Sequence, residues 1–274
     1  MSLSQNTRRR PGVVVDGAPM PGYPLPGVRL IPMRFWSGLL AILLSAAACG
    51  AQETDWNDNL WLQYFGDHPI GTNGWGVHLE GQARLADMGA RWQQILLRPG
   101  VNYEINPSVM LSAGYCFIEA FPYGGFPAPH QFPIQAAWEQ VLWRSEFLGL
   151  RWVQRFRLEQ RWIGVVAPQF GGGWAVDDWR YENRFRYMLR TTIPFKKQSP
   201  WYVAVWDEVF INFGDNVFRN DFDQNRATVA LGRKLSKTVN LEVGYMLQTI
   251  QRRGGQVWEQ NNTVMVSLFS TTPF

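Results

Sequence analysis

Along most of the chain, apolar and polar residues alternate one by one, which is the pattern of a β-strand with two unlike faces. In residues 75–84, for example, Trp75 and Leu79 share an apolar face, whereas His78 and Glu80 share the opposite, polar face. The same alternation predicts ten strands, at 75–84, 92–104, 109–117, 134–144, 150–163, 179–193, 201–212, 224–235, 239–250 and 262–270. We therefore expect an all-β protein.

The number of strands is left open by the pattern. Residues 59–66, with Trp61, Tyr64 and Phe65, form a further candidate strand. Bacterial membrane barrels have an even number of strands. Either 59–66 is a periplasmic segment and there are ten strands, or one strand is unrecognised and there are twelve.

The connections between these strands alternate in length. Short ones lie around 106–107, 147–149, 196–200 and 236–238, and long ones, rich in Gly, Pro, Asn and Asp, lie at 119–133, 164–178, 213–223 and 251–261. Short turns at one end and long loops at the other are typical of an outer-membrane barrel with periplasmic turns and extracellular loops. We expect an antiparallel transmembrane β-barrel of 10–12 strands.

The strands at 150–163 and 179–193 indicate which face meets which solvent, because each carries several arginines on one face. An Arg in the middle of a bilayer costs about 2–4 kcal/mol, so several per strand turned to lipid would exceed the stability of a whole domain. The arginines must face inward, where carboxylates pair with them, and the interior is expected to be polar and rich in Arg and Glu. The predicted lumen charge network is Arg151, Arg155, Arg157, Glu159, Arg161, Arg180, Glu182, Arg184, Arg186, Arg190, Glu208, Arg226 and Glu242.

The opposite faces of the same strands carry aromatic residues that we expect to contact the membrane, namely Trp152, Phe156, Trp162, Trp179, Phe185 and Tyr187. Trp152 and Trp162 are ten residues apart on one face. At ~3.3 Å per residue and ~40° of tilt they span about 25 Å, the height of an outer-membrane apolar band. The chain also ends in Phe274, preceded by alternating apolar positions such as Val266 and Leu268. This ending resembles the C-terminal strand signal that the barrel-insertion machinery reads.

A soluble, lipocalin-like periplasmic barrel is the main alternative fold. In such a barrel the polar face is outside and the apolar face lines a ligand cavity. The two alternatives differ in sidedness: the membrane barrel requires arginines inside, and the soluble carrier requires them outside.

The segment before the strands is expected to direct export. Residues 33–51 have a basic start at Arg34, an apolar run at 39–44 and small residues before Ala51, as in a cleaved signal peptide. Residues 1–32 are then an over-called start or a disordered extension, and residues 52–274 form the barrel. Cys49 is either a small residue near the cleavage site, the preferred interpretation, or the lipidated first residue of a lipoprotein.

The basic character of the whole chain comes from this leader. The formal net charge is +4, but residues 1–51 hold five arginines and one aspartate, which leaves 21 cations and 21 anions for residues 52–274. We therefore expect no nucleic-acid partner. An aromatic content of 15% excludes a disordered chain. The apolar run 35–48 is shorter than the ~20 residues of a membrane-spanning helix.

Five stretches of the chain resemble one bacterial family: RFRLEQR at 155–161, YENRFRY at 181–187, WDEVFIN at 206–212, FDQNR at 222–226 and LEVGY at 241–245. The family is catalogued as domain of unknown function 2490 and is taken to consist of outer-membrane barrels of Gram-negative bacteria. The likeness covers most of residues 56–270. It implies the location and the fold, and it supplies neither an activity nor catalytic residues.

The inward charge network has two interpretations. Paired charges fill the interior of a small barrel and need have no further role, which is the preferred interpretation. Alternatively, they line a narrow aqueous path whose excess of Arg favours anions, by the logic of charged selectivity rings.

An outer-membrane lipid hydrolase is a third class, since such an enzyme needs a nucleophile with a positioned base. His78 is predicted to face inward beside Glu80, and Ser112 lies two strands away, but no spacing links them as a triad. Three scattered histidines match no metal-ligand spacing. Asp215, Asp221 and Asp223 could hold Ca²⁺, although a solvated loop is the preferred interpretation.

The sequence thus predicts a non-enzymatic barrel of the bacterial outer membrane, without cofactor or metal. Its expected partners are the lipid bilayer, lipopolysaccharide and the barrel-insertion machinery. The oligomeric state is left open.

Overall fold

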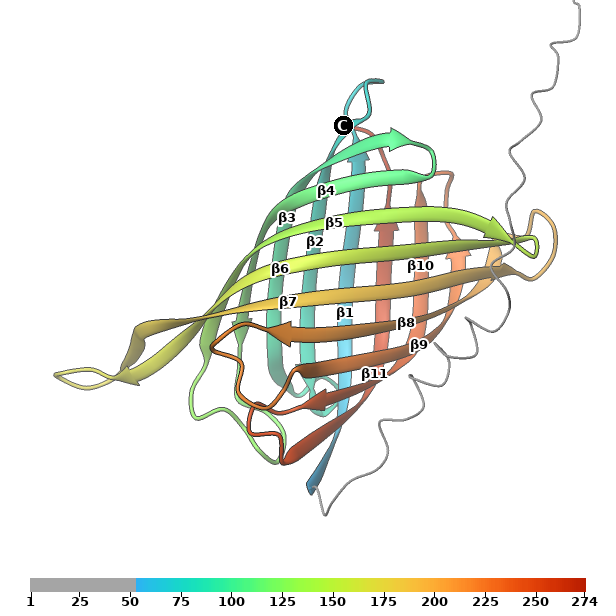
Figure 1. The fold of residues 1–274 in the computed structure, drawn as a ribbon. Helices are drawn as coiled ribbons and strands as arrows, with labels where there is room; N and C mark the ends of the chain where they lie inside the picture. Colours follow the sequence, from blue (N-terminus) through green and yellow to red (C-terminus); the bar gives the residue numbers. More distant parts are fainter. Residues whose placement is uncertain (1–52) are drawn as a thin grey trace, which may run out of the picture. The chain divides into compact units, whose positions relative to one another are not determined.

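The computed structural model describes residues 53–274, which form a closed barrel of eleven strands (Figure 1). The expectations for the over-called start and for the signal peptide at 33–51 fall outside the described residues. The strands are β1 (Glu53–Pro69), β2 (Trp75–Ala86), β3 (Arg91–Asn106), β4 (Val109–Ala120), β5 (Phe132–Phe147), β6 (Leu150–Pro168), β7 (Trp174–Pro194), β8 (Trp201–Phe213), β9 (Phe222–Lys234), β10 (Val239–Gln251) and β11 (Val257–Ser270). The prediction of an all-β barrel of 10–12 strands is confirmed.

The odd number of strands determines how the barrel closes. Each strand pairs antiparallel with its neighbour in sequence, whereas β1 and β11 pair in parallel, from Glu53 opposite Val257 to Gly66 opposite Ser270. An up-and-down chain with an odd number of strands must bring its first and last strands together in the same direction. Residues 59–66 lie within β1. The expectation of an even number of strands is therefore wrong.

The two ends of the barrel differ in their connections, as the sequence indicates. At one end, called the turn end, lie 70–74, 107–108, 148–149, 195–200 and 235–238. At the other, called the loop end, lie 87–90 with the short 3₁₀ helix η1 (Asp87–Gly89), 121–131, 169–173, 214–221 and 252–256. One of the two-residue turns consists of Leu148 and Gly149, both with positive φ, which suits the twist of a two-residue hairpin.

The strands extend further at the loop end than the sequence predicts. Residues 164–178 were expected to be a long loop, but β6 continues to Pro168 and β7 begins at Trp174. Only residues 169–173 are left as a connection, and the β6–β7 hairpin projects beyond its neighbours (Figure 1). The Gly run 171–173 has positive φ throughout, which explains why a tight reversal forms there.

The side chains alternate between the lumen and the outer wall along each strand. Arg157 is 1% exposed inside the barrel, whereas the adjacent Phe156 is 36% exposed on the outer wall. This sidedness is the opposite of a lipocalin-like carrier, in which the apolar face is enclosed and the polar face is outside. Among residues 53–274, no helix is both long and apolar enough to cross a membrane.

One part of the inner wall differs from the expected polar interior. Along β3 to β6 the lumen side carries an apolar cluster that consists of Leu96, Cys116, Ile118, Ile134, Ala136, Trp138 and Ile163. The inward positions of β4 and β5 are nearly as apolar as their outward positions, so polarity alone does not distinguish the two faces there. The lumen therefore has an apolar side and a charged side.

Candidate functional site

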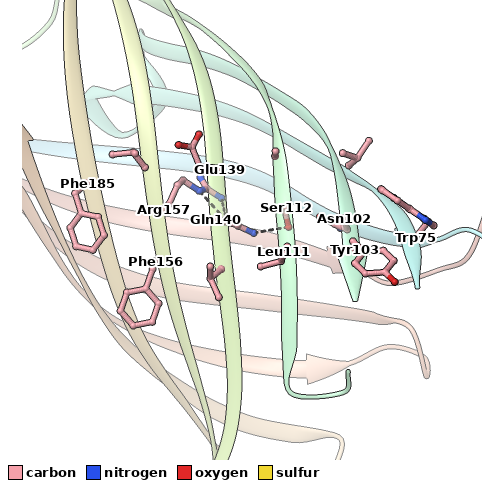
Figure 2. A pocket seen from close by; sticks show the side chains of 14 residues that line it. Trp75, Asn102, Tyr103, Leu111, Ser112, Glu139, Gln140, Phe156, Arg157 and Phe185 are labelled. Carbon is pink, nitrogen blue, oxygen red and sulfur yellow. Dashed lines mark hydrogen bonds between the residues drawn. The ribbon is translucent and has the colours of Figure 1, made fainter. Parts of the chain in front are cut away.

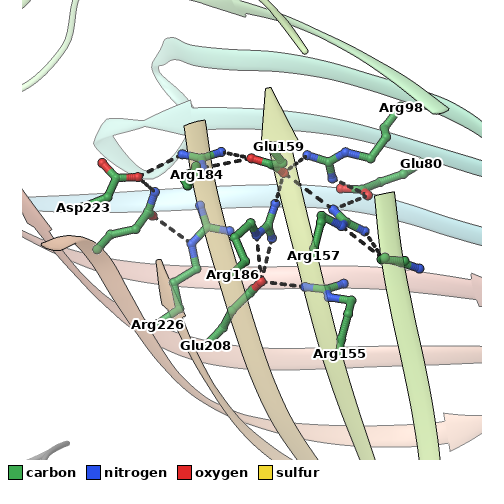
Figure 3. A network of polar contacts seen from close by, with 12 residues as sticks. Glu80, Arg98, Arg155, Arg157, Glu159, Arg184, Arg186, Glu208, Asp223 and Arg226 are labelled. Atoms are coloured by element: carbon green, nitrogen blue, oxygen red, sulfur yellow. Dashed lines mark hydrogen bonds and ion pairs between the residues drawn. The ribbon is translucent and has the colours of Figure 1, made fainter. Parts of the chain in front are cut away.

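The most highly connected polar residue in the lumen is Glu159, on β6 (Figure 3). Arg184 of β7 donates to Oε2 of Glu159 from Nη2, at 2.6 Å, and from Nε, at 2.9 Å. Arg186, two residues further along β7, donates to Oε1 at 2.7 Å, and Arg98 of β3 donates to the same oxygen at 3.2 Å. Such charge-assisted, forked bonds are the strong kind of hydrogen bond.

Further ion pairs extend this network around the barrel. Arg98 also pairs with Glu80 of β2 at 2.5 Å. Arg186 shares Glu208 of β8 with Arg155 of β6, both at 2.8 Å. Arg184 also pairs with Asp223 of β9, at 2.9 Å. The network thus links six strands, β2, β3, β6, β7, β8 and β9.

Two buried aromatic rings support the arginines from within the lumen. Phe210 of β8 is 0% exposed and lies under the guanidinium groups of Arg186 and Arg226, at 4.4 and 4.6 Å from the ring centre. Trp61 of β1 lies under Arg84 and Arg226, at 4.0 and 5.1 Å. Stacking on aromatic faces suits the planar, weakly hydrated guanidinium group.

Smaller groups of charges lie nearer the two ends. Arg190 pairs with Glu242 at 2.5 Å, and the same carboxylate accepts from Tyr202 at 2.8 Å. At the loop end, Arg180 pairs with Glu182 at 2.7 Å.

The loop 121–131 reaches into the loop end through Tyr123. Its hydroxyl donates to Glu259 of β11, which also pairs with Arg252 at 2.5 Å. Burial, together with the neighbouring Glu259 carboxylate, raises the pKa of Tyr123 above its usual value. The phenol therefore remains a donor at neutral pH and ties the loop to β11.

The predicted network residues fall into three groups. Ten of them form ion pairs within 4.0 Å: Arg155, Arg157, Glu159, Arg180, Glu182, Arg184, Arg186, Arg190, Glu208 and Glu242. Arg161 and Arg226 are buried in the lumen, but neither has an ion pair within residues 53–274. Arg151 differs from the expectation, because it is exposed at the end of β6, where the strand leaves the lumen.

Several lumen residues were not assigned to the network from the sequence. Asp223 was considered part of a solvated loop, but it lies in β9 and faces Arg184. The sequence places Glu80 on the inward face beside His78 without an arginine partner, and it does not single out Arg98. The aromatic Trp61 and Phe210 carry no sequence sign that they face inward. The strand register, which the sequence does not reveal, brings these residues together.

The predicted membrane-facing aromatics lie on the outer wall. Phe156 contacts Tyr187 across β6 and β7, with ring centres 5.1 Å apart, and Trp162, near the loop end of the same wall, contacts Tyr181 at 5.4 Å. Trp152, Trp179 and Phe185 lie on the same outward-facing positions of these two strands.

The outer wall over β2 to β7 also has an apolar depression of about 500 Å³. Figure 2 shows Tyr103, Leu111 and Phe156 around it, with Glu139 as its acidic residue. The hydrogen bonds from Arg157 to Gln140 and from Gln140 to Ser112 belong to the lumen side of the same wall.

His78 lies in the lumen near the turn end, beside Glu80. Its Nδ1 is 2.8 Å from Asp67, and its Nε2 has no hydrogen-bond partner within residues 53–274. The hydroxyl of Ser112 accepts from Gln140 at 3.3 Å, and no hydrogen bond within the described part of the chain joins it to His78. The geometry thus contains a positioned histidine without an adjacent nucleophile.

Phe274 lies beyond the end of β11 and packs against the end of β1. Its ring stacks on His68 with 4.3 Å between ring centres, and its backbone N–H donates to Pro69 at 3.1 Å. Within residues 53–274, no cluster of three or more His, Cys, Asp or Glu residues is arranged to hold a metal ion.

Within residues 53–274, the lumen contains a loop-end chamber, a middle chamber and a turn-end chamber that share lining residues. The loop-end chamber has a volume of about 240 Å³, the middle chamber about 70 Å³ and the turn-end chamber about 240 Å³. The middle chamber shares Arg161 and Arg184 with the first, and Trp61, Arg186 and Arg226 with the last.

These features define a closed β-barrel with an aromatic and aliphatic outer wall and a charged lumen. The profile of the family described as "Protein of unknown function (DUF2490)" matches residues 58–260, and the chain belongs to this family. The resemblance seen in the five stretches between residues 155 and 245 is thereby confirmed.

Two further similarities were found. An uncharacterized protein of Methylorubrum extorquens is 26% identical over 194 residues, which cover 69% of this chain and 78% of the relative. Among solved structures, that of the NanC porin is similar with a TM-score of 0.41 and 13% identity, over 72% of this chain and 91% of that chain.

Proposed function

We propose that this protein is a non-enzymatic barrel of the bacterial outer membrane whose lumen is closed by its own ion-pair network. The observation that carries this proposal is the sidedness of the wall. Buried arginines such as Arg157 and Arg186 lie inside, and aromatic or aliphatic side chains cover the outside. A protein that exposes so much apolar surface needs an apolar solvent around it.

The basic residues of the outer wall agree with this environment. Arg233 points outward near the end of β9, where the cost of a cation falls to about 0–1 kcal/mol. Arg91 is exposed at the first residue of β3. Outward carboxylates are held by amides of the next strand. Gln160 donates to Glu139 at 2.9 Å, and Asn225 donates to Asp207 at the same distance.

The lumen network supports a closed rather than an open barrel. Glu159 and the arginines around it are almost fully buried, and the middle chamber is small. The lumen would then stabilise the barrel rather than conduct. The proposal includes a cleaved signal at 33–51, Phe274 as the residue read by the insertion machinery, and lipopolysaccharide as the partner of the loop end.

Membrane fractionation tests the location. The protein should sediment with outer membranes, resist extraction by urea and change its gel mobility on heating. Recovery in the soluble periplasmic fraction would overturn the proposal.

A matched pair of variants tests sidedness directly. Val229 points outward from the middle of β9, so Val229→Arg should lower stability in lipid by about 2–4 kcal/mol. Leu235, in the turn after β9, is the control, and Leu235→Arg should cost about 0–1 kcal/mol. Equal effects in unfolding titrations from lipid vesicles would contradict a lipid-facing wall.

The second candidate function is a narrow anion-favouring channel, which the excess of arginine over carboxylate in the loop-end chamber supports. Conductance measurements in planar bilayers distinguish this channel from a closed lumen. A closed lumen predicts no steady current through the wild-type protein. A steady, anion-selective current that changes sign of selectivity in Arg155→Glu would establish the channel instead.

A further inference from the structure

The middle chamber of the lumen has an unusual lining. It is about 70 Å³ in volume and is lined by six arginines, together with four glutamines and several apolar side chains, but by no Asp or Glu among residues 53–274. The arginines are Arg84, Arg98, Arg161, Arg184, Arg186 and Arg226. They come from β2, β3, β6, β7 and β9, so the closure of the barrel, rather than any local motif, creates the cluster.

Only half of these arginines are neutralised by carboxylates. Arg98, Arg184 and Arg186 pair with Glu80, Glu159, Glu208 and Asp223, which lie outside the chamber lining. The other three, Arg84, Arg161 and Arg226, have no ion pair within 4.0 Å in the described part of the chain.

The neutral partners of these three arginines do not compensate their charge. Arg84 donates to Gln82 at 2.8 Å and to Gln94 at 2.5 Å, and Arg226 donates to Gln224 at 3.0 Å. Arg161 is 8% exposed, and its buried Nε has no hydrogen-bond partner within residues 53–274. A buried cation without a counter-charge is strongly destabilising. The described residues therefore leave the positive charge of these three arginines in the middle chamber without a counter-charge.

We propose that the middle chamber is a binding site for one small inorganic oxyanion of the size and charge of phosphate or sulfate. The volume has room for several waters and hence for one such anion. The planar guanidinium fork matches the oxygens of a tetrahedral oxyanion. Gln93 and Gln248 are on the same lining, and each amide has two N–H groups, of which Gln248 uses one for Gln224 at 2.5 Å. A remaining N–H of each amide is a neutral donor to the other anion oxygens.

The same geometry indicates how the anion reaches the site. The middle chamber shares Tyr123, Arg161 and Arg184 with the loop-end chamber, which is also lined by Arg252 and Arg253. Cations at the mouth raise the local concentration of anions. Tyr123, held by Glu259, lies at the boundary between the chambers, so the loop 121–131 controls entry.

Equilibrium dialysis of the purified, micelle-bound protein with radiolabelled inorganic phosphate tests this site, with chloride held at constant ionic strength. The wild-type protein should take up one phosphate per chain, displaced by sulfate and not by equivalent chloride. Arg84→Gln and Arg161→Gln should each weaken phosphate binding about tenfold, the effect of one charge-assisted hydrogen bond. Arg151→Gln, at the exposed rim, is the matched control and should bind as the wild type does.

Thermal unfolding distinguishes loss of phosphate binding in a variant from loss of its fold. In phosphate-free buffer, Arg161→Gln should unfold at the same or a higher temperature than the wild type, because it removes an uncompensated cation. It should also lose the rise in midpoint that phosphate gives the wild type. Arg161→Lys, which keeps the charge but not the fork, should bind with intermediate affinity.

Absence of phosphate uptake by the wild type, or equal uptake by the wild type and both Gln variants, would overturn the site. Binding in micelles does not depend on where the protein resides in the cell. Failure of this inference is therefore distinguishable from failure of the proposed location, which fractionation decides.

Discussion

Glu159 has the role of a hub because its two oxygens accept from arginines of two different strands, β3 and β7. The contribution of Glu159 to the stability of the barrel therefore depends on all of these arginines and not on a single ion pair. Its removal leaves Arg98, Arg184 and Arg186 buried with fewer counter-charges, and an uncompensated buried charge strongly destabilises the folded state.

We expect Glu159→Gln to destabilise the barrel by about 3–5 kcal/mol, the typical effect of breaking a buried ion pair. The side chain keeps its size, so the loss reports on charge rather than on packing. Denaturant unfolding from micelles, followed by tryptophan fluorescence, measures the difference.

Glu104 provides the matched control for this experiment. It pairs with Arg144 at 3.3 Å, and both side chains are more than a third exposed. Glu104→Gln should therefore cost less than about 1 kcal/mol. If the two substitutions had the same effect, the lumen network would not stabilise the barrel, and the closed-lumen proposal would lose its energetic basis.

At the level of single side chains, the sequence predicts which charged residues face the lumen, but it does not predict their ion-pair partners. The alternation of Arg155, Arg157 and Arg161 with apolar neighbours fixes one face, and the cost of Arg in lipid identifies that face as the inner one. The partner of each Arg depends on register, as with Arg184 and Asp223, 39 residues apart. Aromatic residues on a barrel strand indicate a lipid-facing position, so the inward positions of Trp61 and Phe210 cannot be recognised from residue type.

The parallel pair of β1 and β11 is the one departure from antiparallel order, and it follows from the odd number of strands. The alternation within 59–66 is weak in the sequence, because both the outward Leu62 and the inward Trp61 are apolar. The sequence therefore indicates only a short candidate strand at 59–66, whereas β1 has 17 residues. The rule that bacterial barrels have even strand numbers then led to the wrong alternatives.

Disulfide cross-linking tests the direction of this closure. Leu62 lies opposite Val266 in the parallel register. We expect Leu62→Cys with Val266→Cys to form a disulfide on mild oxidation, because directly paired strand residues lie within bonding range.

A second pair distinguishes parallel from antiparallel closure. Leu60 lies opposite Val264. If β1 and β11 were antiparallel with Leu60 still opposite Val264, Leu62 would lie opposite Asn262 instead of Val266. Leu62→Cys with Asn262→Cys should therefore stay reduced, because four residues along a strand correspond to about 13 Å. Cross-linking of this second pair, with none of the first, would show that the barrel closes differently.

The barrel as a whole is polarised along its axis. The connections at the loop end carry the projecting β6–β7 hairpin and the loop that holds Tyr123, whereas the turn end has short reversals. Because the strand number is odd, β1 begins at the loop end and β11 finishes at the turn end. In the proposed membrane orientation, the loop end and the start of β1 face the outside, and Phe274 faces the periplasm.

Epitope insertion in intact cells measures this orientation. A short tag between Gly172 and Gly173, both exposed at the loop end, should be stained by antibody without permeabilisation. The same tag between Lys197 and Gln198, exposed in the turn after β7, should be stained only after the outer membrane is opened. Both sites are tolerant because neither backbone segment belongs to a strand. Staining of the second tag alone in intact cells would show that the barrel has the opposite orientation in the membrane. The anion entrance at the loop end would then open toward the periplasm.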